Sequence, residues 1–302
     1  MTRQVEPAIE IFTGATGNKL VGEVTGQEAG NIGPPVLLLH GGGQTRHAWR
    51  KTADTIARLG RVAYAVDQRG HGDSEWVADG AYTFLDFAAD ARALADTLAE
   101  RHGTRPVAVG ASLGGIASML AEGGAGKPAN GPAFSALVLV DITPRVDRNG
   151  VAKVQGFMRE HAREGFATVA EAADAVAAYL PHRPRPRSNE GLKKNLRLHP
   201  DGRWRWHWDP RFLEGRRRLG PRGGDVEQML VGAARRIKIP SLLVRGASSE
   251  LVQEEHAKEF LELVPHATYV DVSGARHMVA GDRNDQFANA IKAFLSDLQS
   301  SS

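Results

Sequence analysis

Val107-Ala-Val-Gly-Ala-Ser112-Leu-Gly-Gly115 is the stretch that decides the fold of this 302-residue chain. It begins as a short, β-branched apolar run, which is typical of a buried strand, and the residues after Leu113 have helical spacing. Between them stands a Gly-x-Ser-x-Gly pattern. A serine in a strand-to-helix turn must adopt a strained backbone, and glycines beside it allow close approach where a Cβ would clash. We therefore expect the hydroxyl of Ser112 to be an exposed nucleophile.

Short apolar runs alternate with helical segments on both sides of this turn. The first two runs read as a hairpin, and the later ones are separated by helices. Such alternation predicts a doubly wound, mostly parallel α/β sheet with helices on both faces, which binds ligands at the carboxyl edge of its strands. The other predicted strands are Ile9–Phe12, Lys19–Val24, Val36–Leu39, Val62–Val66, Ala136–Val140, Ser241–Val244 and Ala267–Val272; the predicted helices include Thr45–Leu59, Phe84–His102, Gln253–Val264 and Asp285–Leu298.

Residues 144–236 interrupt the alternation. They contain 20 Lys and Arg against 11 Asp and Glu, although the whole chain has a net charge of only +3. The segment is polar, has helical stretches such as Val169–Leu180, and includes a proline-broken basic loop over residues 181–187. We predict that residues 1–143 and 237–302 form the core and that residues 144–236 form a separate, basic insertion at the carboxyl edge of the sheet.

A serine hydroxyl needs a general base, and the base needs an acidic group to orient it. Among the 11 histidines, His277 alone combines a loop after the last strand with a late position in the chain. Two acids follow strands whose ends would face the same crevice: Glu250 and Asp141. The residues themselves leave this choice open. Asp67 also ends a strand, but its Asp-x-Arg-Gly-His-Gly context indicates a tight turn held by its own side chains.

Attack on a carbonyl creates an oxyanion that needs two fixed N–H donors. The amide of Leu113, directly after the nucleophile, is one candidate. Three glycines follow the strand that ends at Leu39, and their backbone is open to close approach. The amide of Gly42 in that loop is the other candidate. The turn would thus supply both the nucleophile and half of the oxyanion site.

Arg203-Trp-Arg-Trp-His-Trp208 interleaves cations and indoles with a period of two. Such a pattern occurs on nucleic-acid surfaces, but no nucleic-acid module accompanies it and the overall charge is modest. An extended segment with its Trp face packed on the core explains the pattern structurally. In a functional interpretation, Trp204, Trp206 and Trp208 line the substrate pocket, and the basic insertion attracts an anionic or acyl-carrier-linked small molecule.

The composition narrows the classes of function. The chain has no cysteine, so it has neither disulfides nor thiolate metal sites, and we predict no cofactor and no metal. The N-terminal residues lack an apolar signal core, and no run approaches the ~18 apolar residues of a membrane span. We therefore expect a cytoplasmic protein without nucleic-acid or membrane partners. The sequence carries no sign of its oligomeric state.

Together these motifs resemble the α/β-hydrolase fold superfamily, over about residues 8–143 and 237–300. The resemblance rests on His40-Gly-Gly-Gly43, Asp67-Gln-Arg-Gly-His-Gly-Asp-Ser74, Gly110-Ala-Ser-Leu-Gly-Gly115 and Gly274-x-x-His277. It implies an eight-stranded sheet and a helical cap over residues 144–236. It places the triad acid most often at Glu250, and in dehalogenase-like members at Asp141. An Asp nucleophile and a Pro at position 43 are absent, which argues against dehalogenase and epoxide hydrolase activity.

The expected function is that of a cofactor-free serine hydrolase that cleaves a carboxylic ester, thioester or lactone. The same residues would also suit hydrolysis of a C–C bond or perhydrolysis. Two alternatives from other classes remain: a ligand receptor with slow or no turnover on a hydrolase scaffold, and a lyase that uses Ser112 and His277 only as acid and base.

Overall fold

An eight-stranded sheet forms the centre of the molecule, which we describe from a computed structural model covering residues 7–27, 32–124, 131–183, 185–186, 188–214, 224–282 and 284–300. Its strands lie in the order β1-β2-β4-β3-β5-β6-β9-β10. Their bounds are β1 Ala8–Thr13, β2 Lys19–Thr25, β3 Val36–Leu39, β4 Ala63–Asp67, β5 Val107–Ala111, β6 Ala136–Val140, β9 Ser241–Gly246 and β10 Thr268–Val272. All eight predicted strands are present, and every pair from β4 to β10 is parallel.

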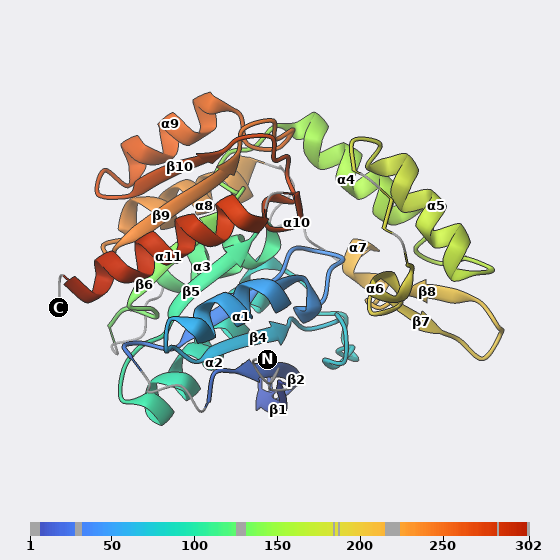
Figure 1. The fold of residues 1–302 in the computed structure, drawn as a ribbon, viewed down its shortest axis with the longest axis horizontal. Helices are drawn as coiled ribbons and strands as arrows, with labels where there is room; N and C mark the ends of the chain where they lie inside the picture. Colours follow the sequence, from blue (N-terminus) through green and yellow to red (C-terminus); the bar gives the residue numbers. More distant parts are fainter. Residues whose placement is uncertain are drawn as a thin grey trace.

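Helices cover both faces of this sheet (Figure 1). One apolar core contains side chains of α2, α3, α8 and α9, and the other contains side chains of η1, α1 and α11. Strands β3, β5 and β6 lie between these two cores, which explains their continuous apolar sequences. The helix bounds are η1 Arg46–Trp49, α1 Arg50–Arg58, α2 Phe84–His102, α3 Leu113–Gly123, α8 Gly224–Arg236, α9 Glu254–Leu263, α10 Val279–Asp282 and α11 Asn284–Ser300.

The helix predicted over Thr45–Leu59 begins as a 3-10 turn, η1, and becomes α-helical only at Arg50. Thr45 is in the N-cap position, but its side chain makes no capping bond and instead donates to Asn195 Oδ1 at 2.9 Å. The carboxylate of Asp67 accepts the Arg46 amide at 2.6 Å, so the first turn is held by the core. A tertiary contact thus replaces the local cap.

Between β6 and β9 lie residues 144–236, here called the insertion. Much of it extends beyond one end of the sheet, at the right in Figure 1. The predicted cap is helical in part, but it also contains a two-stranded hairpin, and its last helix, α8, packs against α3 in the core of the protein. Besides α8 its elements are α4 Arg148–Glu160, α5 Val169–Tyr179, α6 Glu190–Lys193, β7 Leu196–Leu198, β8 Trp204–Trp206 and α7 Arg211–Glu214.

The glycines beside Ser112 are required by the close approach of backbone segments. A Cβ at Gly110 would lie 2.4 Å from the Gly114 carbonyl oxygen, and one at Gly114 would lie 2.2 Å from the Leu39 carbonyl oxygen. The turn therefore packs directly on the neighbouring strand β3, as the sequence pattern predicts.

Gly114→Ala should lower the free energy of unfolding by about 3 kcal/mol, because the clash is with backbone that cannot rotate away. Guanidinium unfolding of the purified variant measures this loss. Gly156→Ala in α4 is the matched control, since nothing lies within 4 Å of its Cβ position. There alanine should stabilise the exposed helix by up to about 1 kcal/mol. Equal effects at the two positions would contradict the packing argument.

Within the described residues, no helix is both long enough and apolar enough to cross a bilayer.

Candidate active site

Ser112 lies at the turn from β5 into α3 with φ 46° and ψ −110°. A positive φ in a non-glycine residue is a strained conformation that the surroundings must enforce. Among the described residues only one other non-glycine residue has it, namely Asp141 at the end of β6, with φ 49°. The Ser112 amide donates to the carbonyl oxygen of Val140 at 3.2 Å, so the two strained residues lie on adjacent strand ends.

The carboxylate of Asp141 receives the imidazole of His277. His277 Nδ1 lies 2.7 Å from Asp141 Oδ2, and Asp141 is fully buried. When Nδ1 carries the proton and donates a hydrogen bond to this carboxylate, Nε2 of the neutral ring is unprotonated and can act as a base. Loop residues 273–278 carry His277 directly after β10.

Two further donors hold the Asp141 carboxylate in place. Ser249 Oγ donates to Oδ2 at 2.5 Å, and the Gly246 amide donates to Oδ1 at 2.9 Å. Both donors come from the end of β9 and the loop after it. Ser249 was not among the predicted site residues, although it stands beside the candidate Glu250. A hydroxyl next to a predicted acid was the signal that could have identified it.

Glu250 does not contact His277. Its carboxylate lies 3.9 Å from Lys153 Nζ in α4, and its carbonyl oxygen packs against Gly150 at the start of that helix. Because β9 is followed by a tight turn through Ser249, the side chain of Glu250 is directed toward the insertion. Of the two acids that the sequence left open, the structure therefore brings Asp141, and not Glu250, to the histidine.

The loop from His40 to Gly43 runs beside Ser112. A Cβ at Gly41 would lie 3.5 Å from Ser112 Cβ, and one at Gly42 would lie 3.9 Å from Leu113 Cβ. The Gly41 amide donates to Gln44 Oε1, and the Gly43 amide donates to His71 Nε2, both at 3.1 Å. Among the hydrogen bonds of the described residues, none uses the amide of Gly42 or of Leu113. Both residues lie in the segments beside Ser112, so their amides stay the candidate donors for an oxyanion.

Two buried histidines hold this loop in shape. His40 Nε2 accepts the Gln68 amide at 3.0 Å, while its Nδ1 donates to the Gly41 carbonyl oxygen at 2.8 Å. Both roles require the neutral ring, and burial lowers the pKa of His40 below its ordinary value of 6.5. The Asp67 turn is likewise structural, because Asp67 accepts the amides of Arg46 and Asp73.

This burial predicts a pH-dependent stability. Burial also lowers the pKa values of His102 and His207. Unfolded histidines bind protons as the pH falls through about 6.5, whereas these folded ones do not until lower pH, so the free energy of unfolding should fall between pH 7.5 and 5. Guanidinium unfolding at pH 7.5, 6 and 5 measures it. Carboxylates such as Glu23 have lowered pKa values, so their protonation lowers the free energy of unfolding only at pH values below this interval. Stability that is constant or rises over this interval would contradict the prediction.

The insertion covers the glycine loop with apolar side chains. A Cβ at Gly43 would lie 2.8 Å from Met158 Cε and 3.7 Å from Trp208 Nε1, and one at Gly42 would lie 3.1 Å from Phe212 Cζ. Sequence reasoning missed Met158 and Phe212, because neither has a motif. Arg183 from the basic loop also reaches the site, since its Nη2 donates to the carbonyl oxygen of Met278, next to His277, at 3.3 Å.

The three tryptophans of the insertion have different surroundings. Trp206 and Trp208 are buried and Trp204 is half-buried. Trp206 packs on Phe157 and Phe166 with ring centroids 5.9 and 5.2 Å apart. This is the packed extended segment that the period of two predicts. Trp208 lies against the glycine loop beside Ser112, since its Nε1 is 3.7 Å from the Cβ position at Gly43.

Comparisons with known proteins agree with this fold. Residues 34–283 match the family model described as alpha/beta hydrolase fold. Esterase Rv0045c of Mycobacterium tuberculosis is 30% identical over 91% of this chain and 87% of its own length. The 2-(acetamidomethylene)succinate hydrolase of Mesorhizobium japonicum is 32% identical over 71% of each chain. A crystal structure of E-2-(acetamidomethylene)succinate hydrolase has a TM-score of 0.80 at 23% identity, covering 96% of this chain and 99% of that one.

Proposed function

Because the chain belongs to the α/β-hydrolase fold family and is a hydrolytic enzyme, we propose that it is a serine hydrolase that cleaves carboxylic esters, thioesters or lactones through an acyl-enzyme on Ser112. The observation that carries this proposal is the 2.7 Å hydrogen bond between His277 Nδ1 and Asp141 Oδ2, which leaves Nε2 to act as the base. The relative that is 30% identical is itself named an esterase.

The proposed reaction has two stages. His277 Nε2 removes the proton of Ser112 Oγ as this oxygen attacks the substrate carbonyl. The amides of Gly42 and Leu113 hold the oxyanion, and His277 then gives the proton to the leaving alcohol, thiol or lactone oxygen. In the second stage His277 takes a proton from water, the resulting hydroxide attacks the acyl-enzyme, and the acid leaves as Ser112 recovers its proton.

Asp141 keeps Nδ1 protonated throughout and stabilises the imidazolium that forms in each stage. The two donors on this carboxylate, Ser249 and the Gly246 amide, fix its orientation. They are positioning groups, since they act through Asp141.

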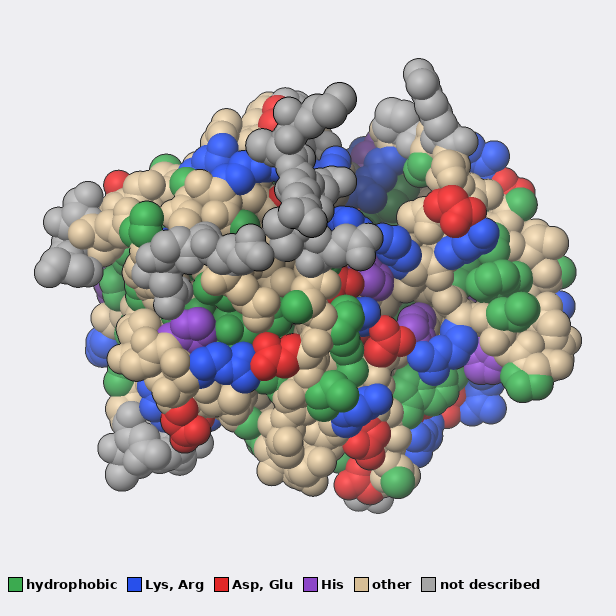
Figure 2. Space-filling model, turned by 60° about the horizontal axis from the view of Figure 1, so that its bottom comes forward, with side chains coloured by type: hydrophobic (Ala, Val, Ile, Leu, Met, Phe, Trp, Pro, Cys, Tyr) green, Lys and Arg blue, Asp and Glu red, His purple; other side chains and the backbone are tan. Residues whose placement is uncertain are grey.

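An anionic small molecule is the proposed substrate class. The insertion has nine more basic than acidic residues. Many of its cations form ion pairs, such as Arg163 with Glu214 and Arg205 with Asp201, and Figure 2 shows basic and acidic side chains interspersed on the face it presents. The remaining positive charge would raise the encounter rate of an anion. One relative is named for a succinate, which is a carboxylate.

Mass spectrometry after treatment with a fluorophosphonate tests the proposal. We expect one label per chain, located on Ser112, and no label in Ser112→Ala. Quenching with acid during turnover of p-nitrophenyl acetate should also trap an acetyl group on Ser112. A protein that binds esters but acquires neither group would be a receptor or an acid–base lyase, and the acyl-enzyme proposal would be wrong.

A further inference from the structure

A cavity of about 320 Å³ lies between the insertion and the loop after β4. Its walls include Trp76 from that loop and Trp206, Trp208 and Arg163 from the insertion. Neither Ser112 nor Asp141 nor His277 lines it. The cavity is therefore separate from the site around Ser112.

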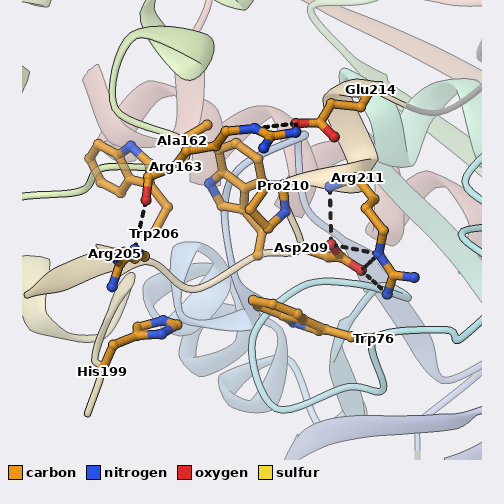
Figure 3. A pocket seen from close by; sticks show the side chains of 11 residues that line it. Trp76, Ala162, Arg163, His199, Arg205, Trp206, Asp209, Pro210, Arg211 and Glu214 are labelled. Atoms are coloured by element: carbon orange, nitrogen blue, oxygen red, sulfur yellow. Dashed lines mark hydrogen bonds and ion pairs between the residues drawn. The ribbon is translucent and has the colours of Figure 1, made fainter. Parts of the chain in front are cut away.

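Aromatic rings dominate two sides of this cavity. Figure 3 shows Trp76 and His199 along one side, with Trp206 and Pro210 along the opposite side. Flat conjugated groups stack on indole faces, as bases do on aromatic side chains in complexes with single-stranded nucleic acids. A slot of this kind favours a fused, planar ring system over a flexible aliphatic chain.

Two of the lining residues, Trp206 and Asp209, are held in place before any ligand binds. Trp206 is held by Phe157 and Phe166, as described above. Asp209 is held by Tyr82 Oη, which donates to its carboxylate at 2.6 Å, and the Asp209 amide donates to the Gly70 carbonyl oxygen at 2.7 Å. A preformed site loses little conformational entropy on binding, which favours affinity.

One arginine at the rim is available to a negative group. Each of the three lining arginines has a carboxylate partner: Arg163 pairs with Glu214, Arg205 with Asp201, and Arg211 with Asp209. Arg211 is committed to the buried Asp209, at 2.6 Å. The side chain of Arg163 is 76% exposed, and its partner Glu214 is 43% exposed. Exposed pairs of this kind contribute little, so Arg163 can turn to an arriving carboxylate.

We propose that this cavity is a second ligand site, separate from Ser112, for a fused aromatic ring system that carries one carboxylate. The rings lie between Trp76 and Trp206, and the carboxylate meets Arg163 at the rim. Trp208 lines the cavity and also touches Gly43 of the glycine loop, so an occupied cavity affects turnover through kcat and does not compete with the ester.

Isothermal titration with naphthalene-2-carboxylate tests the site. We expect equal affinity for the wild type and Ser112→Ala, because the serine is not part of it. Trp76→Ala should weaken binding about tenfold, while Trp76→Phe should retain most of it. Arg163→Met should weaken binding of the carboxylate about fivefold and leave binding of the neutral naphthalene-2-carboxamide unchanged. Arg159→Met is the matched control: Arg159 lies in the last turn of α4, just before the turn that carries Arg163, and is outside the lining, so this variant should bind like the wild type.

Several outcomes would overturn the proposal. These are no binding to the wild type at millimolar ligand, equal binding of cyclohexanecarboxylate, unchanged affinity in Trp76→Ala, or competitive inhibition of p-nitrophenyl acetate turnover. The last result would assign the cavity to the substrate. The titrations measure binding and need no catalysis. If the protein had no esterase activity, the acyl-enzyme proposal would be wrong, but the titrations would still show whether this second site exists.

Discussion

Ser112→Ala should lower kcat for p-nitrophenyl acetate by about five orders of magnitude. The substitution removes the only atom that forms the acyl bond, whereas the glycine loop and the rest of the fold remain. In a serine protease with a Ser-His-Asp triad, loss of the nucleophile costs about 10⁶ in kcat, and what survives comes from the oxyanion donors and binding. Stopped assays at high enzyme concentration, corrected for the buffer rate, measure it.

Ser118→Ala is the matched control for this result. Ser118 lies on the same helix, α3, and its hydroxyl donates to the Gly114 carbonyl oxygen at 2.8 Å. The substitution should cost about 1 kcal/mol of stability and leave kcat within about threefold. If Ser112→Ala keeps a tenth of the wild-type rate, or if Ser118→Ala loses as much, another group is the nucleophile.

The sheet could be predicted because its central strands are buried on both faces. Val107–Ala111 and Ala136–Val140 have no polar side chain, so only a strand between two layers of helices suits them. The glycines of the serine turn were equally informative, since their close backbone contacts tolerate no Cβ. Such features depend on neighbours in sequence and on periodicity, which can be read without coordinates.

The acid could not be chosen from the sequence, because Asp141 and Glu250 both follow strands that end at the same edge. Their directions depend on backbone conformation after the strand. Asp141 has φ 49°, which turns its carboxylate toward His277, and the turn through Ser249 takes Glu250 to α4. The residue types do not predict these conformations. A positive φ is expected at glycine, so nothing in the sequence indicates one at Asp141.

The surroundings of the insertion's side chains were also beyond prediction. The period of two at Trp204–Trp208 correctly indicates an extended segment with a packed face, and β8 and the buried Trp206 and Trp208 agree with it. Which indole meets the glycine loop depends on how residues 144–236 fold back over the sheet. That contact joins positions far apart in the chain, Gly43 and Trp208, so no local pattern encodes it.

Asp141→Asn should lower kcat for the same ester by about 10⁴, and Glu250→Gln should change it by less than about threefold. An amide at position 141 either presents its NH₂ to His277 or leaves the ring in the wrong tautomer, and a corresponding substitution in a serine protease has a cost of that size. Glu250 faces Lys153 at 3.9 Å at a partly exposed position, where an ion pair contributes little. Both variants should keep KM within a few-fold, because neither side chain is expected to contact the substrate.

Ser249→Ala separates an orienting role from general damage to the fold. It removes one of the donors on Asp141 Oδ2 and retains the Gly246 amide on Oδ1, so kcat should fall by about tenfold, between the other two variants. Melting temperatures of all three variants are measured alongside, since a buried carboxamide at position 141 also affects stability. A large loss of kcat in Glu250→Gln together with a mild one in Asp141→Asn would assign the acid to Glu250. The acid stabilises the imidazolium of His277 by its negative charge, so removing that charge must cost most of the activity.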